Sequence, residues 1–410
     1  MKKVVAVLFL LASCCHVALF AKHARSTIDE IPKKKNLTSL EKIAHERNNS
    51  PLLHAVRATR ALYEKYDTLC CKKLDFLKTS YFIESHRHLI TTQPQFFKKR
   101  QTNLKHTIEY DPNTGHIFIL LDSKKAFLGA GKKKTVFKSI LYGQDPKIVA
   151  RGEQAAAMDD ELHAHHALKG VDGLMTTYAF TTHKGRKTKY NAIYSDLYHG
   201  TFRQLLQKNK LSFRNKLIII RDILKGLESI HSRNYVHRDL HANNYLFKIE
   251  QDAKGQKTYR VVIADLGRTI AIGQAEKVPV QGARRLYPPE GFKPKKLAGT
   301  DYFATDIYAT GCVFYWLYHN TRPKWQDHYI KDSRVSTKEK RKILVKRLKR
   351  ETSKRRQALS RKHKRGSLTM KEDTEFLILQ MLRKRPHQRG DATHWRQEAE
   401  RILDRYGIVL

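Results

Sequence analysis

The sequence has few cysteines, and their placement excludes two kinds of site. Five cysteines occur in 410 residues, at Cys14, Cys15, Cys70, Cys71 and Cys312. This is neither the even, spaced set of a disulfide framework nor the paired spacing of a zinc site. We therefore expect the folded part to be reduced or indifferent to thiol chemistry. Internal repeats are absent as well.

Acidic residues are also scarce, with 39 Asp+Glu against 80 Lys+Arg and a formal net charge of +41. Such a charge favours anionic partners, namely nucleic acid, acidic membrane surfaces or acidic proteins, but it serves solubility equally well and says nothing about fold. The hydrophobic content of 40% excludes a disordered chain. The length predicts two or three domains, or one large two-lobed domain with extensions.

The first segment, residues 1–26, has two lysines, an apolar run and then basic polar sequence, the layout of a secretory signal. Within it, "LASC" resembles a bacterial lipoprotein processing site, where Cys14 would carry the lipid. Cleavage after Ala21 is a poorer option because a leucine stands where a small residue is wanted. The remaining option is an uncleaved anchor of about 18 apolar residues. Its basic flank, residues 22–35, would keep the rest of the chain in the cytoplasm.

The rest of the chain changes character twice. Residues 27–106 predict a helical, polar extension, because apolar residues recur at three- and four-residue spacing. Residues 107–129 predict strand, turn and strand, and strand-like runs continue through 107–197. From residue 212 the pattern becomes helical. We therefore expect a small β-rich part followed by a larger helical part, 198–408.

Residues 331–370 form a dense basic stretch, which predicts a basic helical insertion. Its weak apolar stripe consists of Ile343, Leu344, Leu348 and Leu359. Such a helix can bind an anionic membrane surface, a nucleic acid or another partner. A solvated insertion explains the same pattern equally well.

Five residues carry chemistry. Asp239 precedes Asn244 by five residues, so that a carboxylate and an amide can hold a proton and a metal ion over one site. Asp265 follows a strand-like run, where a carboxylate can bind Mg²⁺ that bridges phosphates. Gly129 and Gly131 lie in a turn between strands and let the backbone approach phosphate closely. Positioning and charge neutralisation are most of what phosphoryl transfer asks of a protein.

From about residue 107 to 408 the chain resembles the eukaryotic-type protein kinases. The glycine-rich turn, His-Arg-Asp-x-x-x-x-Asn and Asp-Leu-Gly occur in the order of that family. Further matches are "YPPEGF" at 287–292, "TDIYATG" at 305–311 and "MLRKRPHQR" at 381–389. The resemblance implies an α+β, two-lobed protein-kinase-like fold, with N-lobe 107–197 and C-lobe 198–408, that uses ATP and Mg²⁺.

The resemblance also implies a role for each matching position. Asp239 would be the catalytic base, and Asn244 and Asp265 would hold magnesium. The nucleotide would be covered by Gly129, Ala130, Gly131 and Val136, and Leu197 would lie at the hinge that meets adenine. Structural roles would fall to Arg238 at the activation segment, Asp306 under the catalytic loop, and the pair Glu290–Arg389.

The family's third-strand lysine is missing. Aligning Val149-Ala150 puts Gly152 at that position, and a shift by one puts Arg151 there, whose fork is a poor substitute for a compact ammonium. Lys134 stands where the third glycine of the turn is expected. This is similar to the with-no-lysine kinases, in which a lysine at this position on the second strand reaches the phosphate site. We predict that Lys134 takes this role; the alternative is one of many surface lysines.

Two further positions bear on the phosphate site. The acidic partner of the lysine would come from the helix 155–168, with Glu161 as first choice and Asp159 or Asp160 as alternatives. His241 stands where serine/threonine kinases carry a lysine, and the arginine of tyrosine kinases is missing too. The phosphate would thus have one firm cation fewer, and activity would depend on pH, because histidines titrate near neutrality. "HRDLHANN" partly resembles small-molecule phosphotransferases as well.

The sequence therefore predicts an ATP- and Mg²⁺-dependent protein kinase that transfers the γ-phosphate to protein hydroxyls, with serine or threonine favoured over tyrosine. The alternatives are a pseudokinase scaffold that binds anionic partners and a small-molecule phosphotransferase. Between Asp265 and Glu290 hydroxyls are few, so no activation by phosphorylation is predicted. The first segment predicts export or membrane association, with delivery into a host cell as one route. The substrate, the oligomeric state and the role of 27–106 stay open.

Overall fold

The computed structural model describes most of the chain after residue 35. The described ranges are 36–66, 71–92, 104–121, 124–131, 134–154, 159–184, 189–208, 211–252, 254–275, 286–292, 297, 299, 301–326 and 334–408. The predicted signal or anchor segment with Cys14 lies outside them. The chain forms two compact units, unit 1 (1–157 and 177–197) and unit 2 (158–176 and 198–410). Within the described ranges no helix is both long and apolar enough to cross a membrane.

Unit 1 is built on a seven-stranded antiparallel sheet of order β1-β2-β4-β5-β7-β6, in which β3 also pairs with β4. Its strands are β1 (Thr107–Tyr110), β2 (Ile117–Leu120), β3 (Phe127–Ala130), β4 (Lys134–Tyr142), β5 (Lys147–Gln154), β6 (Thr177–Lys184) and β7 (Lys189–Asp196), with a 3₁₀ turn at Lys124–Ala126. The predicted turn between β1 and β2 is confirmed. The Asp111 carboxylate accepts bonds from the Asn113 N–H and the Thr114 hydroxyl, and Gly115 has the positive φ (72°) that glycine tolerates best.

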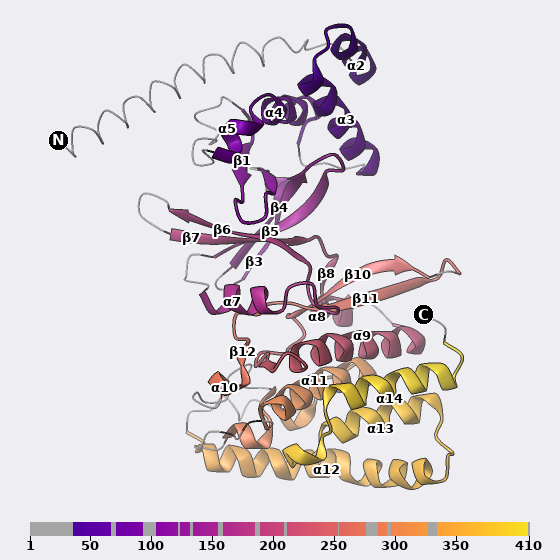
Figure 1. Cartoon of the computed structure of the whole chain (residues 1–410). Helices are drawn as coiled ribbons and strands as arrows, with labels where there is room; N and C mark the ends of the chain where they lie inside the picture. Colours follow the sequence, from indigo (N-terminus) through magenta and orange to yellow (C-terminus); the bar gives the residue numbers. More distant parts are fainter. Residues whose placement is uncertain are drawn as a thin grey trace, which may run out of the picture. The chain divides into compact units, whose positions relative to one another are not determined.

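The N-terminal extension is helical, as predicted, and it belongs to unit 1 (Figure 1). Its helices are α2 (Leu37–Glu46), α3 (Ser50–Lys65), α4 (Lys73–Ser85) and α5 (Arg87–Thr92). One hydrophobic core joins it to the sheet, formed by Ala58, Leu62, Phe76, Phe82, Ile83 and Ile90 of the helices, Leu104, Ala126, and the strand residues Ile108, Ile117, Ile119, Ile140 and Tyr142, with Leu121. The Tyr142 hydroxyl also donates to Glu84 at 3.0 Å, and the Ile148 N–H donates to the Tyr66 hydroxyl at 3.3 Å. The extension is therefore part of the fold of unit 1.

Unit 2 is predominantly helical. Its helices are α7 (Asp159–Ala167), α8 (Phe202–Lys208), α9 (Phe213–His231), α10 (Ile272–Ala275), α11 (Asp301–His319), α12 (Thr337–Lys364), α13 (Met370–Met381) and α14 (Ala392–Arg405), with 3₁₀ turns at Pro289–Phe292, Lys324–Gln326 and Pro386–Gln388. Short strands are β8 (Gly200–Thr201), β9 (Tyr235–Val236), β10 (Tyr245–Gln251), β11 (Lys257–Ile263) and β12 (Ile270–Ala271). The predicted amphipathic helix before the catalytic motif is α9, which begins after Ser212, whose hydroxyl accepts the Asn215 N–H.

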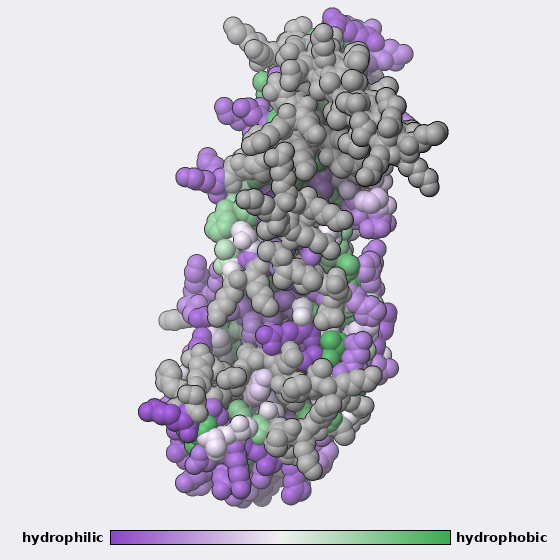
Figure 2. Space-filling view, turned by 90° about the vertical axis from the view of Figure 1, so that its left-hand side faces the viewer, coloured by the Kyte–Doolittle hydropathy of each residue, from purple (hydrophilic) through white to green (hydrophobic). Residues whose placement is uncertain are grey.

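The basic stretch forms α12, and its apolar stripe is buried in the fold. Leu344, Leu348 and Leu359 are buried, whereas the predicted member Ile343 is only partly covered. α12 packs against α13, where Arg355 and Lys362 pair with Glu375 and Glu372, each at 2.7 Å. Figure 2 shows hydrophilic side chains over the lower end of the molecule, where Figure 1 places α12. Exposed cations cover the solvent side of this helix: Lys338, Lys342, Lys346, Lys349, Arg350, Lys354, Arg361 and Lys364.

Candidate functional site

The loop that carries Asp239 is held from below by one buried carboxylate. Asp306 of α11 accepts hydrogen bonds from the backbone N–H of His237 (2.7 Å) and of Arg238 (2.9 Å). The His231 ring lies 3.1 Å from the same carboxylate. Burial works against the charged form of Asp306, but the hydrogen bond and charge of His231 and the nearby His237 hold its pKa below the ordinary value. The predicted brace under the catalytic loop is therefore confirmed.

Asn244 and Asp265 are brought together by the ladder between β10 and β11. Tyr245 pairs with Ile263, and the Ala264 N–H donates to the Asn244 carbonyl at 2.8 Å. The Asn244 side-chain amide donates to the Asp239 carbonyl at 2.9 Å, which leaves its Oδ1 as a ligand. Asp265 is exposed, with φ at 62°. An amide oxygen and a carboxylate fit Mg²⁺, which usually takes one or two protein ligands beside phosphates and water.

The Asp239 carboxylate is flanked on both oxygens. The His241 Nε2 lies 3.8 Å from Oδ1, and the Arg268 Nε lies 3.3 Å from Oδ2. The sequence singled out His241 because it stands where a lysine is usual, but it gave no role to Arg268. The available signal was its position, because Arg268 directly follows Asp-Leu-Gly.

Glu161 is buried in α7, beside the Asp-Leu-Gly backbone of the same unit. A Cβ atom added to Gly267 would lie 3.2 Å from the Asp265 Oδ1 and 3.4 Å from the Glu161 Oε2. Two carboxylates therefore approach this glycine closely, and a side chain there would press on both. The side chains of the alternatives, Asp159 and Asp160, lie outside the described residues.

In unit 1, the side chain of Lys134 lies over Gly152. Val136 pairs with Gly152 across β4 and β5, and a Cβ atom added to Gly152 would come within 3.1 Å of the Lys134 Cδ and 3.5 Å of its Cγ. The position that aligns with the family's missing lysine is thus the space that the stem of Lys134 fills. The Gly131 N–H donates to the Lys134 carbonyl at 2.8 Å and closes the turn between β3 and β4.

Arg151 lies on the other face of the same sheet. Successive side chains of a strand point to opposite faces, so Arg151 is separated from its neighbour Gly152. Its guanidinium lies 5.5 Å from the centre of the Phe137 ring and pairs with Glu153 at 2.5 Å. This placement argues against the prediction that Arg151 contacts the nucleotide on the face that Lys134 occupies.

The remaining predicted positions divide by unit. Gly129 and Ala130 end β3, Val136 follows on β4, and Leu197 is the last residue of unit 1. In unit 2, Glu290 and Arg389 form the predicted pair, with Nη2 2.8 Å from Oε2, and it is fully buried. Thr269, one of the few hydroxyls of the activation segment, is 1% exposed. Residues 276–285 of that segment lie outside the described ranges.

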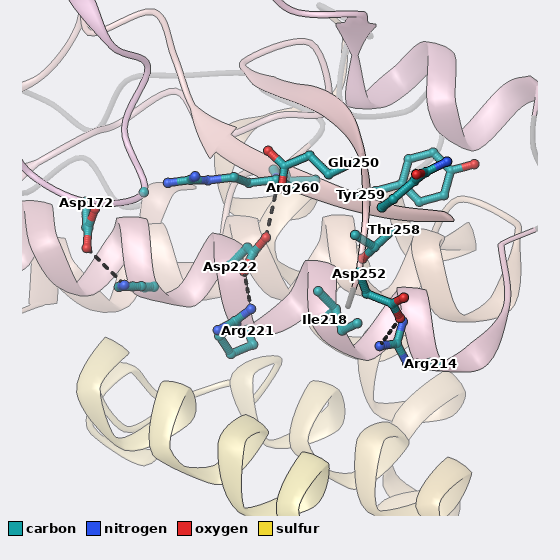
Figure 3. A pocket seen from close by; sticks show the side chains of 14 residues that line it. Asp172, Arg214, Ile218, Arg221, Asp222, Glu250, Asp252, Thr258, Tyr259 and Arg260 are labelled. Carbon is teal, nitrogen blue, oxygen red and sulfur yellow. Dashed lines mark hydrogen bonds and ion pairs between the residues drawn. The ribbon is translucent and has the colours of Figure 1, made fainter. Parts of the chain in front are cut away.

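A pocket of about 420 Å³ opens elsewhere in unit 2, between α9 and the β10–β11 hairpin (Figure 3). Its walls carry ion pairs between Arg214 and Asp252 (2.9 Å) and between Arg221 and Asp222 (2.9 Å). None of the predicted site residues lines it. Burial raises the pKa of Asp222 to about 6, against the opposing charge of Arg221.

Comparison with known proteins agrees with this geometry. The protein kinase domain family model matches residues 123–399. The chain is 28% identical to mitogen-activated protein kinase kinase kinase 17 of Arabidopsis thaliana over 200 residues, which cover 45% of this chain and 48% of that relative. It is 31% identical to serine/threonine/tyrosine-protein kinase HT1 of Arabidopsis thaliana over 120 residues, 28% of each chain. The chain thus spans less than half the length of these relatives. The family model nevertheless covers most of the chain, which belongs to the protein kinase family.

Proposed function

We propose that this protein is an active protein kinase that transfers the γ-phosphate of ATP to protein hydroxyls. The observation that carries the proposal is the intact set of Asp239, Asn244 and Asp265, fixed by backbone hydrogen bonds within unit 2. Asp239 would accept the proton of the attacking hydroxyl. Asn244 and Asp265 would hold Mg²⁺, which, when bound, neutralises phosphate charge.

The nucleotide grip is proposed to rest on Lys134 rather than on a third-strand lysine. The packing of its stem over Gly152 supports this, because the glycine leaves room that a larger residue would fill. Gly129, Ala130, Gly131 and Val136 would cover the nucleotide, with Leu197 at the adenine. Glu161 would serve as the acidic partner of the lysine.

The substrate is proposed to be a protein, in keeping with the names of two matched relatives, a mitogen-activated protein kinase kinase kinase and a serine/threonine/tyrosine-protein kinase. The preference for serine or threonine over tyrosine is proposed from the resemblance in the sequence alone. The rival proposals are a pseudokinase scaffold and a small-molecule phosphotransferase. The lost third-strand lysine and His241 favour the scaffold, whereas the three intact polar positions favour transfer.

The test measures phosphate transfer from radiolabelled ATP with Mg²⁺ to a mixed protein substrate, using the full chain. An Asp239→Asn protein runs beside it, because asparagine keeps the shape of the side chain but cannot accept the proton. We expect label in protein, reduced by about 10²–10⁴-fold in the variant. If the folded wild-type protein transfers no label, the pseudokinase scaffold is favoured. If label appears only in small molecules, the small-molecule phosphotransferase is favoured.

The basic face of α12 is proposed to bind an anionic membrane surface or another polyanion. Because its leucines are buried, this binding would be electrostatic and would weaken steeply with salt. Co-sedimentation with vesicles that contain phosphatidylserine tests membrane binding, and retention on immobilised heparin tests binding to a soluble polyanion. A variant with Lys342, Lys346 and Lys349 changed to glutamine should bind less of the true partner. Binding that is unchanged by this variant contradicts the role of α12.

The first segment is proposed to export the protein or attach it to a membrane, through Cys14 if it is processed as a lipoprotein, and delivery into a host cell would then bring the kinase to ATP. The support is the apolar run between basic flanks. Mass spectrometry of the mature N-terminus distinguishes the outcomes. A lipid on Cys14 supports the lipoprotein reading, and an intact Met1 supports the uncleaved anchor.

A further inference from the structure

The backbone fixes Arg268 next to the catalytic loop. The Thr269 N–H donates to the Leu266 carbonyl at 2.9 Å, so residues 266–269 form a tight turn with Arg268 at its third position. Directly after this turn, β12 pairs with β9, the strand that leads into the catalytic loop. Two anchored segments therefore meet at Arg268, and its closeness to Asp239 follows from the course of the main chain.

The side chain occupies the side of the base that His241 does not reach. The Arg268 Nε lies 3.3 Å from the Asp239 Oδ2, while the His241 Nε2 lies 3.8 Å from Oδ1. The Arg268 side chain is 45% exposed, so its outer N–H groups remain accessible to a ligand. A guanidinium carries five N–H donors in a rigid fork. It can keep one donor on Asp239 and turn others to a second anion.

The reaction places that second anion within reach. A base lies about 2.6–3.2 Å from the hydroxyl that it deprotonates. The hydroxyl oxygen lies about 3–3.5 Å from the phosphorus that it attacks. A cation in contact with the base is therefore next to the phosphoryl oxygens as well. A neutral imidazole offers one donor and no charge, whereas a guanidinium offers five donors and a positive charge.

We propose that Arg268 contacts the γ-phosphoryl group of ATP and supplies the cation that the histidine at position 241 leaves missing. The proposal rests on the kinase activity proposed above. As the bond from phosphorus to the acceptor oxygen forms and the bond to ADP breaks, the hydroxyl proton passes to Asp239. Arg268 exchanges no proton. It neutralises the charge on the transferring oxygens, and it orients the base through their contact.

The first test needs no turnover. Dissociation constants for Mg²⁺-ATP and Mg²⁺-ADP are measured by calorimetry with the wild-type protein, Arg268→Ala and Arg268→Lys. Arg260→Ala, which removes an exposed arginine on β11, is the matched control. We expect Arg268→Ala to weaken the binding of ATP at least tenfold more than the binding of ADP. Arg268→Lys should have an intermediate effect, and the control should bind both nucleotides as the wild-type protein does. An unchanged ratio of the two constants, or an equal loss for both nucleotides, would overturn the proposal.

The second test uses transfer. Arg268→Ala should lower kcat by about 10²–10³-fold, the usual effect of removing one group that stabilises transition-state charge. Adding His241→Lys to that variant places an ammonium at the position where the family has one. This second substitution should raise kcat at least tenfold above that of Arg268→Ala. A rise in kcat in Arg268→Ala would show that the arginine blocks the base and would refute the proposal. If the wild-type protein transfers no phosphate but Arg268→Ala still shifts the ATP to ADP ratio, the kinase activity fails and the phosphate contact stands.

Discussion

The two units treat the pattern of their family differently. Unit 2 keeps the family's three polar positions, the carboxylate of Asp306 under the catalytic loop and the buried pair Glu290–Arg389. In unit 1, one alignment puts Gly152 at the position of the family's third-strand lysine, and the stem of Lys134 packs over it. Unit 1 also shares its core with a helical extension. The residues proposed for transfer therefore follow the family's pattern, whereas the cation proposed for the phosphates comes from a different strand.

The largest effect should come from breaking a buried pair of unit 2. Glu290→Ala leaves Arg389 charged and without its partner in an environment where it is 0% exposed. We expect a loss of about 3–5 kcal/mol in the free energy of unfolding, because removing one member of a buried pair strands the other. Urea unfolding followed by tryptophan fluorescence reports on unit 2, since Trp316, Trp325 and Trp395 all lie there.

The control for this variant is Glu398→Ala, which breaks a partly exposed pair with Arg401, whose side chains are 30% and 42% exposed. Exposed pairs contribute about 0–1 kcal/mol, so its transition should hardly move. Equal shifts for the two variants would mean that the Glu290 pair contributes no more than a surface contact.

A substitution in the core that the helical extension shares with the sheet of unit 1 should destabilise that unit. Phe76 of α4 is fully buried, and its ring centre lies 6.3 Å from that of Tyr142 on β4. Phe76→Ala should cost about 3–5 kcal/mol in the unfolding of unit 1. Far-UV circular dichroism should show an earlier transition while tryptophan fluorescence keeps that of unit 2. Phe127→Ala, at a side chain that is 49% exposed, is the control and should have little effect. A Phe76→Ala transition that coincides with the wild type would separate the extension from the sheet.

If Lys134 binds the phosphates in place of a third-strand lysine, a lysine at position 152 should restore activity that is lost when Lys134 is removed. Lys134→Ala should lower kcat/KM for ATP by about 100-fold, because it removes a cation from the phosphates. Adding Gly152→Lys should recover much of this loss, since it places the ammonium at the family's position and the shortened residue 134 leaves room for it. Lys138→Ala, four residues along the same strand, is the control. A Lys134→Ala enzyme with unchanged ATP dependence refutes this role.

The smallest effect concerns the pocket of unit 2 and its pH dependence. The pKa of Asp222 is about 6 in the folded protein against an ordinary value of 3.8. The folded state therefore binds more protons between these pH values, and stability should fall as pH rises from about 4 to about 6, by at most about 3 kcal/mol. Asp222→Asn should flatten this part of the stability profile of unit 2. A profile that the substitution leaves unchanged would contradict the raised pKa.

The sequence predicted best what local backbone determines. The distance between Asp239 and Asn244 depends on one short loop, so spacing alone indicated the site. The choice between Lys134 and Arg151 depended on which strand face each occupies, and a one-residue shift in alignment reverses that face. The pairing of Val136 with Gly152 shows which face each side chain occupies, and the role of Lys134 stays a prediction.

Sequence motifs could not predict the contact of Arg268 with Asp239 or the packing of the helical extension. The contact between Arg268 and Asp239 results from the pairing of β9 with β12, two dipeptide strands too short to show a pattern. The sequence of residues 37–92 predicted helices with an apolar face, but it did not show which surface covers that face. The structure shows that the β1–β2 hairpin and β4 cover it. In α12, likewise, the pattern showed an apolar stripe but not that the stripe is buried in the fold.

The shared core of unit 1 also sets an order of events during synthesis. The apolar faces of α3 and α4 are covered by residues as late as Tyr142, so roughly the first third of the chain must leave the ribosome before they are buried. At about 5–20 residues per second, these faces stay open for several seconds. A protein or membrane that binds the N-terminal segment during that interval therefore binds a chain in which α3 and α4 are not yet packed.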